Sequence, residues 1–445
     1  NSINFILNFS ISFILTFTTS LMDLITSQEN IQLAYRNLKK NDGSYTAGVD
    51  GKNIEYLQKW EMNKLISHIQ KKFNNYSPQP VRRVEIPKPN GKTRPLGIPT
   101  IMDRMIQQCI LQVLEPICEA KFHKKSNGFR PNKSTENAIA QMETLIQLSN
   151  YHIVVDIDIK GFFDNVNHPK LLKQIWTLGI RDKKLISIIS SMLKAEVRGI
   201  GIPEKGTPQG GILSPLLSNI VLNELDWWIA SQWEFFPLEE NKCKNKNYYL
   251  KNSKLKRCYI VRYADDFKII CKKKSDAEKL FIATKKWLKE RLGLETSPEK
   301  SKIVNLRKHY SEFLGFKIKV KFKRKKYVIK SCISDKAKMK IKANCNKAIE
   351  SIQNSKDDLD EIINIQKYNS TIIGIHNYYQ IATMVCWDLG KIAYEISRTM
   401  YIKLRKRVNR KCNKVNKKGY VYERYRKEQT STIFIRANSC STWLC

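Results

Sequence analysis

Two adjacent aspartates between two short apolar runs constrain the fold of this chain most strongly. Residues 258–264 (CYIVRYA) and 267–271 (FKIIC) have the composition of strands, and only Asp265 and Asp266 separate them. This pattern predicts a hairpin with both carboxylates at its tip. Adjacent carboxylates repel each other unless a cation lies between them, so the tip is a candidate Mg²⁺ site. An ordinary solvated turn is the alternative for an isolated Asp-Asp pair.

Net charge indicates the kind of partner. The 445 residues include 79 Lys and Arg against 41 Asp and Glu, which gives a formal charge of +38. Such an excess repels itself unless a polyanion neutralises it, so we expect nucleic acid as the partner. The length predicts several domains. Lysine-rich codon usage and a membrane-surface protein are the alternatives for the charge.

Cysteine and histidine patterns argue against two other kinds of site. The eleven cysteines contain no C-x-x-C pair, which is typical of reduced intracellular thiols and not of a disulfide framework or a zinc module. The six histidines form no recognisable constellation, so we expect no histidine chemistry.

The N-terminal segment is apolar but does not have the pattern of a signal or an anchor. It has no basic region ahead of its apolar run, and Ser, Thr and Asn interrupt it. We interpret residues 1–25 as an apolar leader that comes from an extended reading frame, with Met22 as the expected start. We expect no stable membrane association.

A second strand carries carboxylates that could complete a metal site. Residues 151–160 (YHIVVDIDIK) read as a strand, and Asp156 and Asp158 fall on the same face of it because side chains alternate. Asp164 lies just beyond. Two-metal phosphoryl transfer needs carboxylates that hold ions roughly 3.5–4 Å apart. The spacing alone does not decide between Asp156 and Asp158 as the partner of Asp265 and Asp266.

Two further segments could hold a phosphorylated substrate. Residues 81–99 read as a hairpin around Asn90-Gly91, and its cations Arg82, Lys88 and Arg94 suit a triphosphate. The glycine-rich loop 206–211 (GTPQGG) leads into an apolar helix over 212–225 and contains Gln209. Glycine lets such a loop approach a sugar or a base closely.

The end of the chain reads as basic and largely helical. Lys317, Lys319, Lys321 and Lys323 alternate with Ile318, Val320 and Phe322, which predicts a strand with one core face and one lysine face. The lysine row suits a phosphate backbone or a solvated surface. After Ser334 the composition predicts helices.

The order of several motifs resembles group II intron-encoded reverse transcriptases over about residues 31–430. The matching segments are 86–99 (IPKPNGKTRPLGIP), 126–131 (SNGFRP), 158–164 (DIKGFFD), 206–216 (GTPQGGILSPL), 263–266 (YADD), 291–301 (RLGLETSPEKS), 313–316 (FLGF) and 368–379 (YNSTIIGIHNYY).

The resemblance implies an α+β, right-hand polymerase fold. Fingers and a palm with an antiparallel sheet would occupy residues 67–319 after an N-terminal fingers extension over 26–66. A helical thumb, or maturase X domain, would occupy 335–415, and a basic tail would occupy 416–445. Many relatives continue into an HNH endonuclease. The basic stretch here ends without an endonuclease motif, so target-strand cleavage by this chain is not expected; truncation or a frameshift is the alternative explanation of this end.

The resemblance also assigns residues. It selects Asp158, with Asp265 and Asp266, as catalytic ligands of two Mg²⁺ ions. It implies that Phe163 lies under the incoming sugar and rejects a 2′-hydroxyl, so that dNTPs are favoured; core packing is the alternative. The expected substrate-binding residues are Arg82, Lys88, Arg94, Phe163, Gln209 and Lys300, of which Lys300 could equally be a solvated lysine.

The implied function is an RNA-directed DNA polymerase that also assists splicing as a maturase. Its partners would be group II intron RNA, a DNA target or primer, and dNTPs, in the bacterial cytoplasm or in an organelle; a homodimer is compatible with the sequence. The rivals are a non-catalytic RNA-binding splicing cofactor and a retron-type reverse transcriptase. Gly374, Asn377, Tyr378 and Tyr379 favour the maturase over the retron type.

Overall fold

A computed structural model describes residues 20–87, 91, 93–235 and 253–411 of the chain. The chain divides into two compact units, residues 1–138 with 155–303 and residues 139–154 with 304–445. Lys88, residues 1–19 of the leader, residues 236–252 and the 416–445 tail lie outside the described residues.

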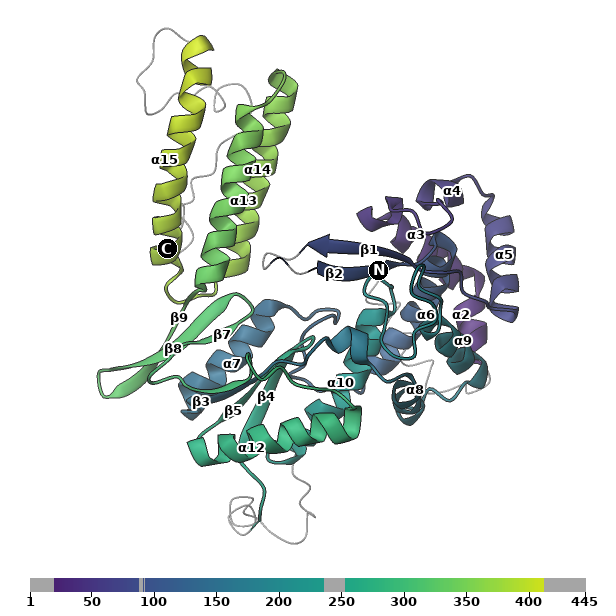
Figure 1. The fold of residues 1–445 in the computed structure, drawn as a ribbon, viewed down its shortest axis with the longest axis horizontal. Helices are drawn as coiled ribbons and strands as arrows, with labels where there is room; N and C mark the ends of the chain where they lie inside the picture. Colours follow the sequence, from purple (N-terminus) through teal and green to yellow (C-terminus); the bar gives the residue numbers. More distant parts are fainter. Residues whose placement is uncertain (1–19, 88–90, 92, 236–252, 412–445) are drawn as a thin grey trace. The chain divides into compact units, whose positions relative to one another are not determined.

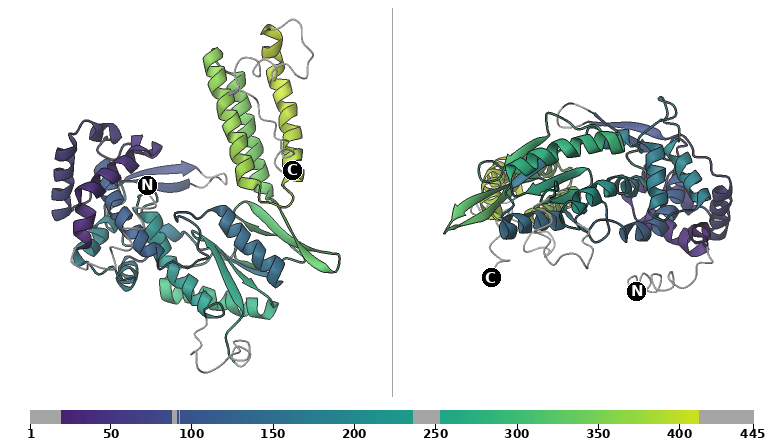
Figure 2. Two further views of the ribbon diagram at one scale, coloured as in Figure 1. Left: turned by 180° about the vertical axis from the view of Figure 1, so that it is seen from behind. Right: turned by 90° about the horizontal axis from the view of Figure 1, so that it is seen from below.

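The first unit begins with helices that gather around α6. Figure 2 shows these N-terminal helices as a cluster, and α2 and α3 both pack on α6. Ser20 caps α2 and Ser27 caps α3, as expected for hydroxyl side chains at helix N-termini. The elements are α2 (Leu21–Thr26), α3 (Gln28–Lys39), η1 (Asp42–Tyr45), α4 (Ile54–Gln58), α5 (Met62–Asn74) and α6 (Ile101–Glu119).

A two-stranded hairpin leads into α6. β1 (Arg82–Pro87) pairs antiparallel with β2 (Thr93–Ile98), with Ile86 opposite Arg94. This confirms the hairpin predicted from residues 81–99.

The carboxylate-bearing strands belong to one four-stranded sheet in the order β4-β5-β3-β6. β4 (Cys258–Tyr263) pairs antiparallel with β5 (Asp266–Cys271), and Tyr263 lies opposite Asp266, so Ala264 and Asp265 form the turn. α10 (Ser214–Ser231) packs on β4 and α12 (Lys274–Trp287) packs on β5, which Figure 1 shows. The sequence prediction of this hairpin is confirmed.

Short elements complete the first unit. The π-helical turn η3 (Leu288–Leu292) ends at Gly293, whose φ of 70° gives the left-handed cap that glycine adopts easily. The other elements are β3 (Ile153–Ile157), η2 (Phe162–Asn165), α8 (His168–Thr177), α9 (Lys183–Leu193) and β6 (Lys302–Asn305).

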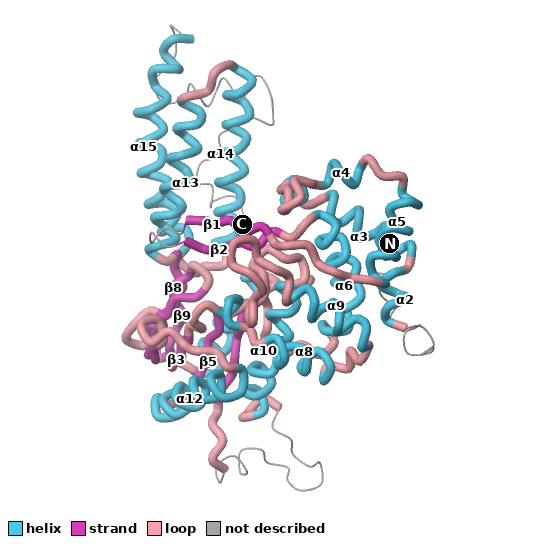
Figure 3. Tube along the Cα trace, turned by 45° about the vertical axis from the view of Figure 1, so that its right-hand side comes forward, coloured by secondary structure: helices cyan, strands magenta, loops and turns pink. Residues whose placement is uncertain are grey.

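The second unit joins a small sheet to three long helices. α7 (Thr135–Ser149) belongs mostly to this unit, and β7 (Ser311–Phe313), β8 (Phe316–Lys323) and β9 (Lys326–Ile333) form an antiparallel sheet. Ser334 caps α13 (Asp335–Gln353), so the helices begin where the composition predicts. α14 (Asp358–Tyr379) and α15 (Val385–Lys411) pack beside α13 (Figure 3).

Isoleucine dominates the buried face of this three-helix bundle. Ile341, Ile349, Ile365 and Ile392 are all at most 6% exposed and belong to one hydrophobic cluster with Tyr368.

The antiparallel sheets and the C-terminal helices together confirm the expected mixed α and β fold.

The expectation for the lysine-alternating strand is partly wrong. Ile318 and Val320 are buried as predicted, but Phe322 is 67% exposed and contacts Tyr327 on the neighbouring strand. The reason is that β8 and β9 extend past the core at this end. Lys317 is also not a free surface cation, because its Nζ lies 2.7 Å from the Asp335 carboxylate.

Candidate polymerase site

Asp265 lies at the turn between β4 and β5, in an environment that disfavours its negative charge. Burial raises the pKa of its carboxyl, and the charges of Asp266 and Asp158 raise the pKa further, while Arg94 opposes the shift. The three carboxylates predicted as metal ligands are therefore close enough to interact electrostatically. A cation between them would relieve this cost.

The two aspartates of the second strand have different partners. Asp156 is 5% exposed, and its Oδ1 lies 3.2 Å from Nζ of the buried Lys268. Asp158 comes after the last residue of β3, and its half-exposed carboxylate lies 3.3 Å from the Lys300 ammonium. Asp156 is thus engaged in a buried ion pair, whereas Asp158 faces partly toward solvent.

Lys268 connects this buried pair to the hairpin. Its Nζ also lies 3.4 Å from Oδ1 of Asp266. Burial alone would lower the pKa of Lys268. The carboxylates of Asp156 and Asp266 outweigh this effect and raise the pKa, so the ammonium stays charged. The sequence reading missed Lys268; the available signal was a lysine between Phe267 and Ile269 in an otherwise apolar strand.

The segment that follows η3, residues 297–301, is hydrogen-bonded to the backbone at the end of β3. The amide of Ser297 donates to the Asp158 carbonyl at 2.8 Å, and the Asp158 amide donates to Ser301 Oγ at 3.2 Å. These bonds bring Lys300 beside Asp158.

The basic hairpin and the glycine-rich loop are joined to each other. Arg94 Nε donates to Gln209 Oε1 at 2.6 Å, and the Gly97 amide donates to the Gln209 carbonyl at 2.7 Å. A side chain at Gly210 would place Cβ 2.5 Å from the Gly97 carbonyl oxygen, so this close approach needs glycine. The Gln209 side chain also donates to Asp164 at 3.4 Å.

The same loop supports the residue predicted to face the sugar. The Thr207 amide donates to the Phe163 carbonyl at 2.7 Å. Phe163 is 9% exposed, and its ring packs edge-to-face with Phe129, with centroids 6.4 Å apart. Phe129 was not selected from the sequence.

Arg82 carries a buried donor atom without a partner. Its Nε has no hydrogen-bond acceptor among the described residues. Buried donors are normally paired, so this nitrogen is one of several exceptions in the described part of the chain.

The donor set fits a hard divalent cation. Carboxylate oxygens are the ligands that Mg²⁺ prefers, and the charges of Asp158 and Asp266 both act on the Asp265 carboxyl. In the described parts of the chain, no three His, Cys, Asp or Glu side chains form a preassembled metal group. Asp158 and Asp266 instead each face a lysine.

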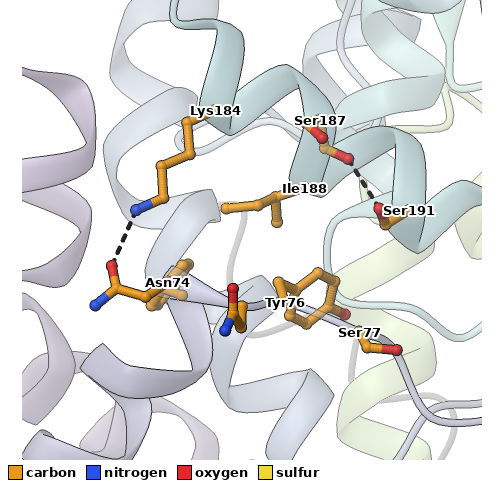
Figure 4. Close-up of a pocket in the computed structure, with 9 residues that line it drawn as sticks. Asn74, Tyr76, Ser77, Lys184, Ser187, Ile188 and Ser191 are labelled. Atoms are coloured by element: carbon orange, nitrogen blue, oxygen red, sulfur yellow. Dashed lines mark hydrogen bonds between the residues drawn. The ribbon is translucent and has the colours of Figure 1, made fainter.

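A separate polar pocket of about 470 Å³ lies between α5 and α9 (Figure 4). Lys184 Nζ donates to Asn74 Oδ1 across it, and Ser191 donates to the Ser187 carbonyl. None of the predicted site residues lines this pocket.

No described helix is both long enough and apolar enough to cross a membrane.

Comparison with known proteins identifies the class. The model of the family "Reverse transcriptase (RNA-dependent DNA polymerase)" matches residues 86–318. The chain belongs to this reverse transcriptase family. It therefore contains an RNA-dependent DNA polymerase domain.

Individual relatives place the chain near intron-encoded proteins. It is 34% identical to Protein YkfC of Escherichia coli K12 over 67% of this chain and 82% of YkfC. It is 33% identical to the group II intron-encoded protein LtrA of Lactococcus lactis over 78% of this chain and 64% of LtrA. It is 30% identical to a putative COX1/OXI3 intron 2 protein of Saccharomyces cerevisiae over 68% of this chain and 39% of that protein.

Proposed function

We propose that this protein is a group II intron-encoded reverse transcriptase that copies intron RNA into DNA and assists splicing. One observation carries the polymerase part. Arg94 donates to Gln209 of the glycine-rich loop at 2.6 Å, and Gln209 donates to Asp164 of η2 at 3.4 Å. The charges of Asp158, Asp266 and Arg94 also act on the pKa of the Asp265 carboxyl. Carboxylates for metal and a cation for phosphate thus meet at one place.

The proposed domains follow the right-hand arrangement. Residues 67–319 would be fingers and palm, 26–66 a fingers extension and 335–415 the thumb or maturase X domain. The match to the family model over residues 86–318 supports the first of these. The three-helix packing of α13, α14 and α15 supports the last.

In this proposal Asp158, Asp265 and Asp266 hold the metal. Two Mg²⁺ ions, when bound there, would neutralise the charge that develops on the transferring phosphate. Arg82, Lys88 and Arg94 bind the triphosphate, and Lys300 turns from Asp158 to the phosphates. These cations orient the nucleotide and hold its charge in place, which is the protein's main contribution to phosphoryl transfer.

Phe163 and Gln209 would recognise the sugar. The Thr207 amide fixes the Phe163 backbone through its carbonyl, and the Phe129 ring packs edge-to-face on the Phe163 ring, so we expect the ring to hold its place against a 2′-hydroxyl. A rigid ring rejects an extra oxygen by steric clash. Gln209, fixed by Arg94, lines the same corner.

Primer extension tests the polymerase proposal. Purified protein should extend a DNA primer on an RNA template with dNTPs and Mg²⁺, and EDTA should stop the reaction. Extension that needs no added metal, or no extension at all at any Mg²⁺ concentration, would contradict it.

The helical end supports RNA binding as a second function. On α15, residues 387, 391, 394, 398 and 401 follow the i, i+4, i+7 spacing of one helix face. Three of them are aromatics that are 70%, 73% and 46% exposed: Trp387, Tyr394 and Tyr401. Lys391 and Arg398 lie between them and are exposed as well.

The charges on this face favour a polyanion. The acidic neighbour Glu395 already has its carboxylate 2.5 Å from Lys342 on α13, so it does not offset the two cations. A groove of about 540 Å³ runs beside Trp387, Lys391 and Tyr394. Exposed aromatics that alternate with cations suit unpaired bases and phosphates of RNA.

RNA binding can be tested apart from catalysis. Because stacking contributes about 1–3 kcal/mol per base, the double variant Trp387→Ala/Tyr394→Ala should bind intron RNA at least tenfold more weakly. Tyr45→Ala, which removes a 54% exposed aromatic from η1, is the matched control and should bind normally. Equal affinity of the double variant and the wild type would exclude this face.

The non-catalytic alternative makes a distinct prediction. A splicing cofactor that only retains the fold would bind intron RNA and incorporate no dNTP. The chain keeps Asp158, Asp265 and Asp266, the three carboxylates that metal-dependent polymerisation needs, which favours the catalytic reading.

A further inference from the structure

Arg262 is a fully buried arginine one strand position before the Tyr263-Ala264-Asp265-Asp266 turn. Its exposed fraction is 0%, and it is the largest fully buried side chain among the described residues. It belongs to β4, whose neighbouring residues Ile260 and Val261 are apolar and buried. A charge in such a place is costly unless each of its donors is paired.

Two residues of α10 pair with its guanidinium. Nε and Nη2 donate to the Asp226 carboxylate at distances from 2.6 to 3.0 Å, and Nη1 donates to Asn219 Oδ1 at 2.9 Å. Asp226 and Asn219 are themselves completely buried. The arrangement is a bidentate fork with an additional amide partner.

The remaining contact reaches the turn itself. Nη1 donates to the Ala264 carbonyl oxygen at 2.8 Å. Ala264 has a φ of 56°, a left-handed conformation that alanine rarely adopts. This oxygen belongs to the peptide group that joins Ala264 to Asp265. A hydrogen bond to it therefore restrains the orientation of that peptide plane and, with it, the backbone position of Asp265.

A loop on the other side of β4 closes the same cluster. The Arg262 amide donates to the Lys125 carbonyl at 3.0 Å, and the Asn127 amide donates to the Arg262 carbonyl at 2.8 Å. Asn219 donates to the Gly128 carbonyl at 2.8 Å, which joins the loop to the guanidinium cluster. Gly128 is pressed against the turn, because a Cβ there would lie 2.2 Å from the Ala264 nitrogen.

We propose that Arg262 is a positioning residue for the polymerase reaction: its buried bonds to Asp226 and Asn219 hold the Ala264–Asp265 peptide in the orientation that catalysis needs. This rests on the proposed polymerase function. Arg262 touches no substrate, and it acts through Asp265.

Stability alone does not account for this arrangement. Replacing a buried ion pair by apolar side chains of similar volume is often neutral or stabilising. An apolar side chain could fill the space beside residue 226, but it could not donate a hydrogen bond to the Ala264 carbonyl. Arginine is suited to this because its planar fork presents several donors in fixed directions.

The decisive variant is therefore Arg262→Met/Asp226→Leu, which removes both charges together. We expect cooperative unfolding near the wild-type temperature, but kcat for dNTP incorporation reduced about 100-fold, since small misplacements of catalytic groups have effects of this size. The KM for dNTP should stay within about threefold because the triphosphate contacts are untouched. A folded double variant with kcat within about threefold of wild type would overturn the proposal.

Two further variants separate positioning from packing. Arg262→Lys can still pair with Asp226 but cannot reproduce the fork, and it should also lose kcat selectively; wild-type kcat in this variant would count against the proposal. Arg104→Met is the matched control, because Arg104 is a 5% exposed arginine that donates to the Gly43 and Thr46 carbonyls instead. It should lower stability and leave kcat unchanged.

A readout without catalysis distinguishes failure of this proposal from failure of the proposed function. Amide hydrogen exchange over residues 263–266 should be at least tenfold faster in the double variant than in the wild type, whether or not the wild type makes DNA. Unchanged exchange would show that Arg262 does not hold the turn. A wild type that makes no DNA, with faster exchange in the variant, would refute the polymerase function alone.

Discussion

Asp265 and Asp266 are neighbours in the chain but have different surroundings. Asp265 is at the turn, where burial and the charges of Asp266 and Asp158 raise its pKa. Asp266 opens β5 and lies 3.4 Å from the buried Lys268, which Asp156 also contacts. The chemistry of a carboxylate here depends on its partners, and sequence adjacency says little about it.

The aromatic at position 163 gives the first prediction at this scale. If Phe163 excludes the 2′-hydroxyl, Phe163→Ala should increase the ratio of rNTP to dNTP incorporation by at least tenfold, with a smaller effect on dNTP incorporation. Single-nucleotide incorporation on an RNA template measures this ratio. Phe162→Ala is the control, because the Phe162 ring is 3% exposed beside Phe163 but is not the predicted contact.

An equal change in both variants would indicate that loss of packing, and not loss of a sugar contact, altered selectivity. An unchanged ratio in Phe163→Ala would assign Phe163 to the core alone.

Residue types in a pattern predicted much of the local structure but little of the buried polar network. The Asp-Asp hairpin followed from apolar runs on either side of two carboxylates. The partners Lys268, Arg262 and Asp226 did not, because each pairing joins segments that only the folded chain brings together. A charged residue inside an apolar strand was the one available signal.

At the scale of elements, the loop 126–131 must approach the β4–β5 turn closely. Gly128→Ala should therefore displace the turn and reduce primer extension at least tenfold, because the added Cβ would lie 2.2 Å from the Ala264 nitrogen. Steady-state extension and thermal unfolding measure the two effects.

Gly374 in α14 is the matched glycine. A Cβ there meets nothing within 4 Å, so Gly374→Ala should raise the free energy of unfolding by about 0.5–1 kcal/mol and leave extension unchanged. Normal extension by Gly128→Ala would mean that the loop can retreat and that its contact with the turn is dispensable.

Element boundaries were predictable where caps and periodicity agree. The composition predicts helices after Ser334, and α13 begins at Asp335 with Ser334 as its cap. The strand with alternating lysines was predicted correctly in type but not in burial at Phe322. Alternation shows which face a side chain joins, but it does not show how far the core extends along the strand.

At the scale of the whole molecule, the charge of +38 predicts a strong dependence of RNA binding on salt. The logarithm of the binding constant should fall linearly with the logarithm of salt concentration, with a slope of about −0.7 per neutralised phosphate. The double variant Lys391→Ala/Arg398→Ala should reduce this slope by about 1.4 if both cations contact phosphates.

Fluorescence anisotropy titrations at several KCl concentrations measure the slope. A slope equal to that of the wild type would place the phosphate contacts elsewhere on the chain.

The class of protein was predictable from motif order, because the spacing of several short segments is specific even where each segment alone is not. The family match over residues 86–318 agrees with that reading. The boundaries of the two compact units, at residues 138, 155 and 303, were not predictable from the sequence. They depend on pairing between strands such as β3 and β6, which are far apart in the sequence.

We propose that Asp265 belongs to a metal-dependent polymerising centre. Primer extension on an RNA template with dNTPs and Mg²⁺ should fall by at least 1,000-fold in Asp265→Asn, which keeps the size of the side chain but removes its charge, a loss of about 4 kcal/mol in transition-state stabilisation. Asp42→Asn, at an exposed aspartate of η1, should behave as wild type. Extension by Asp265→Asn at the wild-type rate would contradict the account.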